Sequence, residues 1–186
     1  MIAFDFDDVV GDTDSVMMEG IFKRTGHRVP HRNDYYFDLP ENMTREEGDK
    51  LTYKVLYEDT HLIKPLNNSI FWLSEFYKLT QKPIHILTAR PNFLKYPTEK
   101  WMREHVNYKF PYFITLCGNV PKIEFLRKDK YFVDDKISTA NDVAKTLDKS
   151  FLINKPWNEN KEILPNVIRV NDLGEVLKHY KLLEKI

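Results

Sequence analysis

The stretch that decides the fold is Met1-Ile2-Ala3-Phe4-Asp5-Phe6-Asp7-Asp8, in which an apolar run passes into three aspartates. An apolar run of this length, bounded by polar residues, is typical of a short buried strand. Runs of the same apolar, β-branched or aromatic character recur at Ile84–Leu87, Phe113–Leu116, Tyr131–Val133, Phe151–Ile153 and Val167–Val170. Such runs, fed by helical stretches, predict a parallel sheet covered on both faces.

The segments between these runs carry helix signals. Thr44-Arg45-Glu46-Glu47 is a capping box that opens a helix through about Asp59. Near the end of the chain, Asp172 with Glu175 caps a segment whose apolar residues share one face. Further crossover helices are expected at Thr98–Val106 and Asp142–Leu147. The alternation predicts an α/β protein with three layers, Rossmann-like, built on a doubly wound parallel sheet.

One interval breaks the alternation. From residue 14 to residue 65 the sequence has helical and loop character but no convincing strand, and it is too long for a tight connection. We predict a small helical insertion after the first strand, because its aromatic and aliphatic residues need a surface to pack against. A long surface excursion is the alternative. The predicted core then comprises residues 1–13 and 66–186.

The composition is that of an ordinary globular protein. The chain has 186 residues, with 28 Lys plus Arg against 28 Asp plus Glu, so its formal net charge is zero. Non-specific polyanion binders carry a basic surplus, which argues against nucleic-acid coating. Cys117 is the single cysteine, which excludes an intramolecular disulfide and a cysteine-based zinc finger. Because no stretch is long enough to span a membrane and the first residues are acidic, we expect a soluble, cytoplasmic protein.

Polar residues follow several of the predicted strands at the point where each strand ends. In open α/β sheets the carboxyl ends of the strands hold the ligand, so these residues are the candidates for a site. They are Asp5, Asp7 and Asp8 after the first run, Thr88-Ala89-Arg90 after the second, and Asp134-Asp135 after the run at 131–133, with Lys122 in the connection before that run.

Convergence of these acids requires positive charge. Two carboxylates about 4 Å apart repel by roughly 4 kcal/mol at an effective dielectric constant of 20. Lys122 supplies one positive charge, and the oxygen-rich remainder indicates a hard divalent cation, for which Mg²⁺ is the natural choice. Zinc is disfavoured, because none of the six histidines forms a paired ligand motif. Acids, Mg²⁺, a lysine and a hydroxyl together are suited to moving a phosphoryl group.

The order of these residues resembles the four-motif signature of haloacid dehalogenase (HAD) superfamily phosphatases. The pieces are Asp5-Phe6-Asp7 after an apolar strand, then Thr88, then Lys122, then Asp134-Asp135. A lone DxD is a weak signal, whereas four pieces in the correct order are a strong one. The resemblance implies a HAD-like core, and it implies that the insertion after the first strand is a helical cap that closes over the substrate.

The resemblance also implies roles for the residues. Asp5 would be the nucleophile and a Mg²⁺ ligand, and Asp7 would be the general acid/base, with its backbone carbonyl on the metal. Asp134 would be the third metal contact, while Asp135 would support the metal's waters or Lys122. The residues expected to hold the phosphoryl group are Thr88, Ala89, Lys122 and Lys100.

Further features are similar to the 5'(3')-deoxyribonucleotidase family, especially its bacterial and phage members. They are the stretch from Asp5 to Thr13, Lys100, Cys117-Gly118-Asn119 and Lys155-Pro156-Trp157-Asn158. This resemblance implies hydrolysis of nucleoside monophosphates. Tyr35-Tyr36-Phe37 would then stack on the base or, as we favour, fill the core of the insertion. Trp157 either lines the pocket or covers the edge of the sheet.

The function we expect is that of a Mg²⁺-dependent phosphomonoesterase, a 5'-nucleotidase that works through an aspartyl-phosphate. The alternatives are a phosphatase of another small metabolite, or a polynucleotide 3'-phosphatase, which the neutral charge opposes. A signalling receiver domain places its acidic pair first and its lysine last, unlike this chain. The expected partner is a small phosphomonoester, with no membrane and no stable nucleic-acid complex, and a homodimer is left open.

Overall fold

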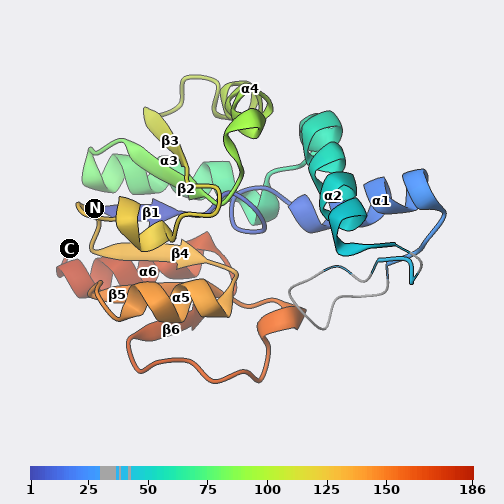
Figure 1. Cartoon of the computed structure of the whole chain (residues 1–186). Helices are drawn as coiled ribbons and strands as arrows, with labels where there is room; N and C mark the ends of the chain where they lie inside the picture. The colour runs from blue at the N-terminus through green and yellow to red at the C-terminus, as the bar shows by residue number, and fades with distance from the viewer. Residues whose placement is uncertain (30–36, 38, 42) are drawn as a thin grey trace.

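The strands form one parallel sheet. The structure, a computed structural model, describes residues 1–29, 37, 39–41 and 43–186. Within these residues the chain builds a six-stranded sheet in the order β3-β2-β1-β4-β5-β6, and every neighbouring pair is parallel (Figure 1). The strands are β1 (Ile2–Phe4), β2 (Ile84–Thr88), β3 (Tyr112–Leu116), β4 (Tyr131–Asp134), β5 (Lys149–Ile153) and β6 (Val167–Val170). The predicted α/β fold with a doubly wound parallel sheet is confirmed, and all six apolar runs are strands.

Helices cover both faces of this sheet. The α-helices are α1 (Thr13–Thr25), α2 (Arg45–Asp59), α3 (Ser69–Thr80), α4 (Lys95–Val106), α5 (Ile137–Ala144) and α6 (Leu173–Glu184). Short 3₁₀ turns are η1 (Thr60–Leu62), η2 (Leu66–Asn68), η3 (Asn92–Leu94), η4 (Lys122–Phe125) and η5 (Pro156–Asn158). Helices α3 and α6 pack with β1 on one face, whereas α5 packs with β4 and β5 on the other (Figure 1). None of the described helices is both long enough and apolar enough to span a bilayer.

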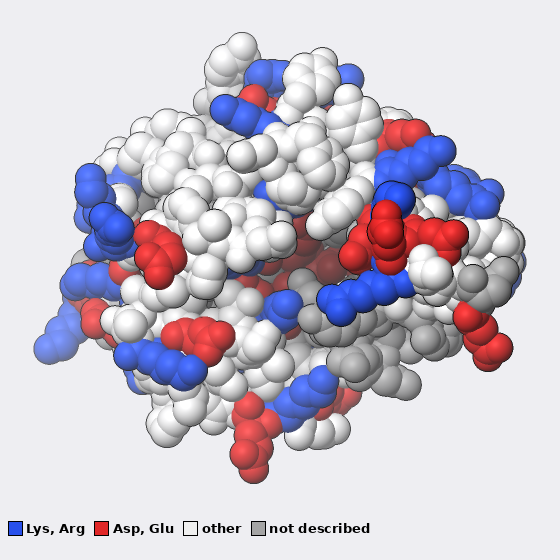
Figure 2. All heavy atoms as spheres, viewed as in Figure 1, with Lys and Arg blue, Asp and Glu red and all other residues white. Residues whose placement is uncertain are grey.

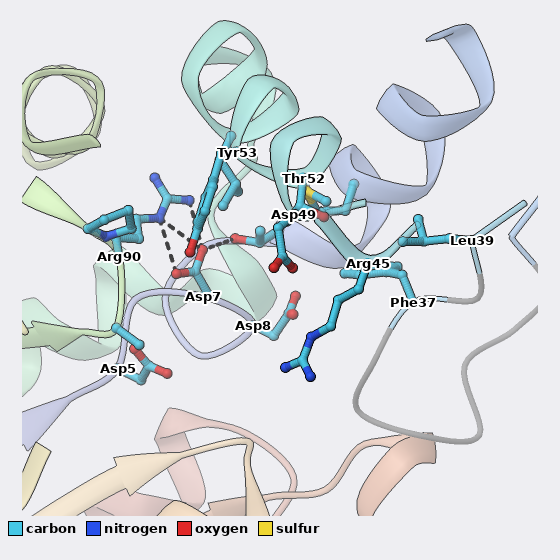
Figure 3. Close-up of a pocket in the computed structure, with 15 residues that line it drawn as sticks. Asp5, Asp7, Asp8, Phe37, Leu39, Arg45, Asp49, Thr52, Tyr53 and Arg90 are labelled. Carbon is cyan, nitrogen blue, oxygen red and sulfur yellow. Dashed lines mark hydrogen bonds and ion pairs between the residues drawn. The ribbon is translucent and has the colours of Figure 1, made fainter. Parts of the chain in front are cut away.

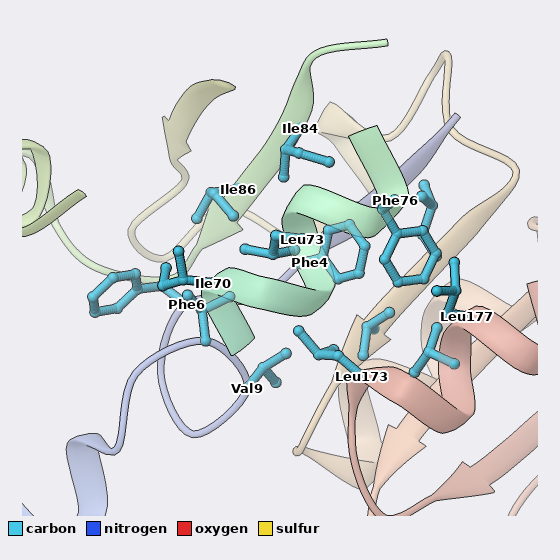
Figure 4. Packing of buried hydrophobic residues seen from close by; sticks show 14 of the residues in the cluster. Phe4, Phe6, Val9, Ile70, Leu73, Phe76, Ile84, Ile86, Leu173 and Leu177 are labelled. Atoms are coloured by element: carbon cyan, nitrogen blue, oxygen red, sulfur yellow. The ribbon is translucent and has the colours of Figure 1, made fainter. Parts of the chain in front are cut away.

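Strand β1 is central because its side chains are apolar on both faces. Phe4 is fully buried on the α3 and α6 side, where its ring meets the edge of Phe76 at 5.1 Å between centroids (Figure 4). Ala3 points the other way, into the cluster with Phe132. Alternate side chains of a strand point to opposite faces, so burial of both faces requires an uninterrupted apolar run. The opening sequence supplies that run.

The interval after β1 holds two helices that pack on each other. Met17 and Ile21 of α1 and Val55 of α2 form a separate buried cluster, and the Arg24 guanidinium lies 2.7 Å from an Asp59 carboxylate oxygen. The two segments that connect this helix pair to the rest of the chain lie side by side, since the Asp12 N–H donates to the Lys64 carbonyl oxygen at 2.9 Å. The capping box that opens α2 is present as expected. In the described residues of 14–65 we find no strand, and the division into core and cap stays a prediction.

Two helix boundaries differ from the sequence prediction. Helix α4 begins at Lys95 rather than Thr98, because Pro97 lies in the first turn, where its missing N–H costs nothing. Helix α5 ends at Ala144, so only the first half of the expected segment Asp142–Leu147 is helical. The second half is a turn, in which the Leu147 N–H donates to the Val143 carbonyl oxygen. The β-branched residues in the first turn of α5 have low helix propensity, so the sequence did not indicate where this helix begins.

Helix α3 offers a test of the core. Phe76 is fully buried between Phe4 and Tyr180, whereas Phe71 on the same helix is 54% exposed. We expect Phe76→Ala to lower the free energy of unfolding by about 3–5 kcal/mol, because it removes the ring and leaves a cavity. Phe71→Ala should cost less than about 1 kcal/mol. Urea unfolding of both variants checks the packing, and equal losses would contradict it.

Candidate phosphoryl-transfer site

The site lies where the chain leaves the central strands. From β1 the chain goes to β2 on one side of the sheet and reaches β4 on the other, so the carboxyl ends of these strands form a switch point. Asp5 directly follows β1, Thr88 ends β2 and Asp134 ends β4. The parallel register therefore brings residues that are far apart in the sequence to one edge of the sheet.

Lys122 joins two of these acids. Its Nζ atom lies 2.7 Å from Asp5 Oδ2 and 2.8 Å from Asp134 Oδ2. Burial alone would lower the pKa of Lys122, but the two carboxylates raise it above its usual value, so the ammonium stays charged. Backbone N–H groups hold the other oxygens: Phe6 donates to Asp5 Oδ1 and Lys136 to Asp134 Oδ1, each at 2.7 Å.

A third buried acid completes the cluster. Asp5, Asp134 and Asp135 each offer a carboxylate oxygen, and these atoms all lie within 4.8 Å of one another. Burial raises the pKa of Asp5 to about 8 despite Lys122, and burial together with Asp134 raises the pKa of Asp135 well above its usual value. One ammonium therefore leaves negative charge uncompensated. A hard divalent cation with oxygen ligands fits this donor set, and Mg²⁺ is such a cation.

Asp7 belongs to a second ion pair. Arg90 donates to it from Nε, at 3.1 Å to both carboxylate oxygens, and from Nη2 at 2.7 Å to Oδ1. The hydroxyls of Thr13 and Thr88 also donate to Asp7, at 2.7 and 3.2 Å. Although burial acts in the opposite direction, the charge and hydrogen bonds of Arg90 lower the pKa of Asp7. Asp5 and Asp7 therefore have pKa values shifted in opposite directions.

Arg90 was a strand-end candidate in the sequence, but sequence reasoning gave it no partner and no role. It is 2% exposed, its guanidinium carbon lies 4.4 Å from the centroid of the Phe6 ring, and Nη1 donates to the hydroxyls of Thr60 and Thr98. An arginine is rarely buried without a carboxylate partner. Its place two residues after Thr88, at a strand end, was the available signal.

A pocket of about 700 Å³ opens above these acids. Figure 2 shows a hollow on this face of the molecule with acidic atoms in its depth. The floor contains Asp5, Asp7, Asp8, Ala89 and Arg90. Residues of α2 form the opposite wall, and Figure 3 shows Arg45 and Asp49 reaching from it toward the side of Asp8. The wall residues are Arg45, Asp49, Thr52, Tyr53 and Leu56 from α2, Thr13 and Met17 from α1, and Phe37 and Leu39.

Most of the predicted site residues converge, but one does not. The structure brings together Asp5, Asp7, Thr88, Ala89 and Lys122, along with Asp134 and Asp135. Lys100 is exposed on α4, lies 3.9 Å from a Glu104 carboxylate oxygen and lines a different hollow, so the structure does not bring it to this pocket. Tyr35 and Tyr36 lie outside the described residues, while Phe37 lines the pocket.

The parallel α/β sheet has the arrangement of a HAD-like Rossmann fold, and solved structures support that fold. CbbY from Rhodobacter sphaeroides in complex with phosphate is similar, with a TM-score of 0.61, 12% identity, and 94% of this chain and 95% of that chain covered. A provisionally named phosphoglycolate phosphatase from Lactobacillus delbrueckii subsp. bulgaricus has a TM-score of 0.63, 12% identity and 96% coverage of each chain. A provisionally named phosphatase from Clostridium difficile has a TM-score of 0.61, 18% identity and 96% coverage of each chain.

At such identities the likeness shows the fold, and the site must be argued from this chain's own residues. No family profile matches the sequence, and no curated protein matches it. The expected HAD-like Rossmann fold is confirmed by these structures. They do not point specifically to nucleotidases, so the substrate is a separate question.

The raised pKa values predict how Mg²⁺ and pH act on stability. Burial raises the pKa of Asp5 to about 8 and that of Asp8 to about 7, against an ordinary value of 3.8. Such a carboxyl binds its proton more tightly when folded, so its contribution to stability is full below the ordinary pKa and is lost as the pH rises through the folded pKa. Without Mg²⁺ we expect the Tm to fall as the pH rises from about 6 to about 8.

Mg²⁺ should reverse this loss, because it needs the deprotonated carboxylates and competes with their protons. The stabilisation by Mg²⁺ should therefore be larger near pH 8 than near pH 6. Calorimetry at both pH values checks it, with KCl at matched ionic strength as the control. A Mg²⁺ effect that is the same at both pH values would contradict the assignment.

Proposed function

We propose that this protein is a Mg²⁺-dependent phosphomonoesterase that hydrolyses nucleoside monophosphates through an aspartyl-phosphate on Asp5. The observation that carries the proposal is the contact of one buried ammonium, Lys122, with both Asp5 and Asp134, beside a pocket that Asp5 and Asp7 line. A nucleophile beside a fixed positive charge, with a second carboxylate close by, meets the requirements of phosphoryl transfer.

Each residue has a role in two steps. A carboxylate oxygen of Asp5 attacks phosphorus and forms an acyl phosphate, while the bond to the ester oxygen breaks and Asp7 gives that oxygen a proton. Asp7 then takes a proton from water, which attacks the phosphorus and releases phosphate and Asp5. Lys122 and the hydroxyl of Thr88 hold the phosphoryl oxygens. Mg²⁺, held by Asp5, Asp134 and the backbone carbonyl of Asp7 with Asp135 close by, would neutralise the phosphoryl charge when bound.

The wall opposite the acids supports a nucleotide as the substrate. The pocket volume is in the range of about 300–1,000 Å³ that is typical of small-molecule sites. Arg45, Asp49, Thr52 and Tyr53 line it from one helix, spaced so that they share a face. A nucleoside needs an aromatic face for its base and polar groups for its edges, and this stripe offers both. We accordingly assign residues 14–65 as a cap that recognises the leaving group.

A polynucleotide phosphate end is a second candidate, and one observation favours it. The Tyr53 ring meets the Phe93 ring at 5.3 Å between centroids, and exposed Tyr57 and Tyr96 share the next hollow. Successive aromatic faces suit successive bases of a single strand. The balanced charge of the chain argues against tight binding of a polyanion. The same assay separates the two substrates.

The first test is hydrolysis of a substrate panel with and without Mg²⁺. We expect nucleoside monophosphates to be hydrolysed faster than glycerol phosphate, phosphoglycolate or a 3'-phosphorylated oligonucleotide, and only with Mg²⁺. Asp5→Asn should lower kcat by at least about 10³-fold, because an amide is not a nucleophile. The control is Asp148→Asn, because Asp148 is exposed and directly precedes β5. Full activity of Asp5→Asn would exclude the covalent mechanism.

A matched pair on α2 tests recognition of the base. Tyr53 lines the pocket and Tyr57, one turn further on, does not. Tyr53→Ala should raise KM for a nucleoside monophosphate by about 5–150-fold, since stacking on a base is worth about 1–3 kcal/mol. Its kcat/KM for glycerol phosphate should not change. Tyr57→Ala should leave both substrates unaffected. Equal effects of Tyr53→Ala on the two substrates would contradict stacking.

A further inference from the structure

The segment Lys155–Asn158 reaches back to the acidic cluster. Trp157 lies in η5, is 3% exposed, and donates its indole N–H to Asp135 Oδ2 at 2.9 Å. The two residues are 22 positions apart in the sequence. The function proposed above gives no role to this contact, although a buried N–H to carboxylate bond is among the stronger hydrogen bonds of a protein.

The neighbour of Trp157 fixes the segment in place. Asn158 is fully buried, and its side-chain amide donates to the Asp135 carbonyl oxygen at 2.7 Å and to the Ile153 carbonyl oxygen at 2.8 Å. The guanidinium of Arg169, on β6, in turn donates to the Asn158 carbonyl oxygen at 2.8 Å and to Asn158 Oδ1 at 3.1 Å. The backbone and the carboxylate of Asp135 are thus both held by this one short segment.

Asp135 needs such support because of its surroundings. One of its oxygens lies within 4.8 Å of oxygens of Asp5 and Asp134, and like charges at that distance repel. A carboxylate that is free to rotate would turn away from the other two. The bond from Trp157 to Oδ2 opposes that rotation and keeps the acidic oxygens together.

We propose that Trp157 is a positioning residue for Mg²⁺, acting through Asp135. This inference rests on the Mg²⁺ site of the proposed function. The alternative is that Trp157 only packs, in which case its loss lowers stability and leaves the metal affinity unchanged. Hydrogen-bond partners that orient groups at a metal site typically change metal affinity by about 10–100-fold when they are removed.

The chain contains a matched control for the test. Trp101 is 1% exposed, and its indole N–H donates to the Ile63 carbonyl oxygen at 2.7 Å. Trp157→Phe and Trp101→Phe therefore each remove one buried indole N–H bond, but only the first bond goes to a carboxylate. We expect both variants to lose stability. Only Trp157→Phe should bind Mg²⁺ more weakly, by about 10–100-fold in titration calorimetry without substrate.

A double variant tests whether the effect passes through Asp135. Asp135→Asn should weaken Mg²⁺ binding. Adding Trp157→Phe to it should cause no further loss of affinity, because Trp157 acts on Mg²⁺ only through the carboxylate that Asp135→Asn removes. Losses that multiply would overturn the proposal. Should Trp157→Phe not fold, benzothienylalanine at position 157 keeps the ring shape and removes only the N–H, and it should show the same loss of affinity.

The outcomes separate the two proposals. If the unaltered protein does not bind Mg²⁺, the metal site of the proposed function fails. If it binds Mg²⁺ and Trp157→Phe binds it equally well, the proposed function stands and the role of Trp157 is overturned. Weaker binding by Trp101→Phe of the same size as for Trp157→Phe would also overturn it, because the loss would then reflect general destabilisation.

Discussion

The candidate site depends on the burial of more carboxylates than ammonium groups at the ends of the central strands. Lys122 contacts two of the three clustered carboxylates, those of Asp5 and Asp134, at 2.7 and 2.8 Å, but it carries only one positive charge. Buried ions of this kind are costly unless they are paired and hydrogen-bonded, so a fold does not retain such a cluster for stability. Its retention is explained by a ligand that brings positive charge, and a site that binds a cation and a phosphate together has that property.

The fold separates this cluster from a second charged pair. Asp7 lies two residues after Asp5, yet its carboxylate is bound by Arg90 and by two threonine hydroxyls rather than by Lys122. The separation gives two carboxylates from one loop different electrostatic surroundings, and pKa values shifted in opposite directions. A nucleophile needs the lower pKa and a proton donor the higher one, so the proposed roles require a cation at Asp5 that lowers its pKa. The two acids thus differ in their surroundings without any difference in residue type.

The sequence predicted those features that depend on local pattern or on the ends of strands. Apolar runs identified the strands, and strand ends identified the acids, because parallel strands bring their carboxyl ends together. The pairing of Arg90 with Asp7 was missed, since the two residues lie 83 positions apart and only the folded chain brings them together. Lys100 was placed in the site by resemblance alone, and a helical lysine carries no local signal of direction. The sequence did not predict the contact of Trp157 with Asp135, because it joins two separate segments of the chain.

In the proposed function, the chemistry and the recognition of the substrate lie in different parts of this chain. Phosphoryl transfer requires groups held to within fractions of an ångström, so it needs the rigid ends of β1, β2 and β4. Recognition of the leaving group tolerates variation, and here its candidate residues lie on α2, which packs mainly on α1. Solved structures that share the fold at 12–18% identity show the fold alone, so both parts rest on this chain's own residues. The choice among phosphomonoesters is for that reason argued from Arg45, Asp49 and Tyr53.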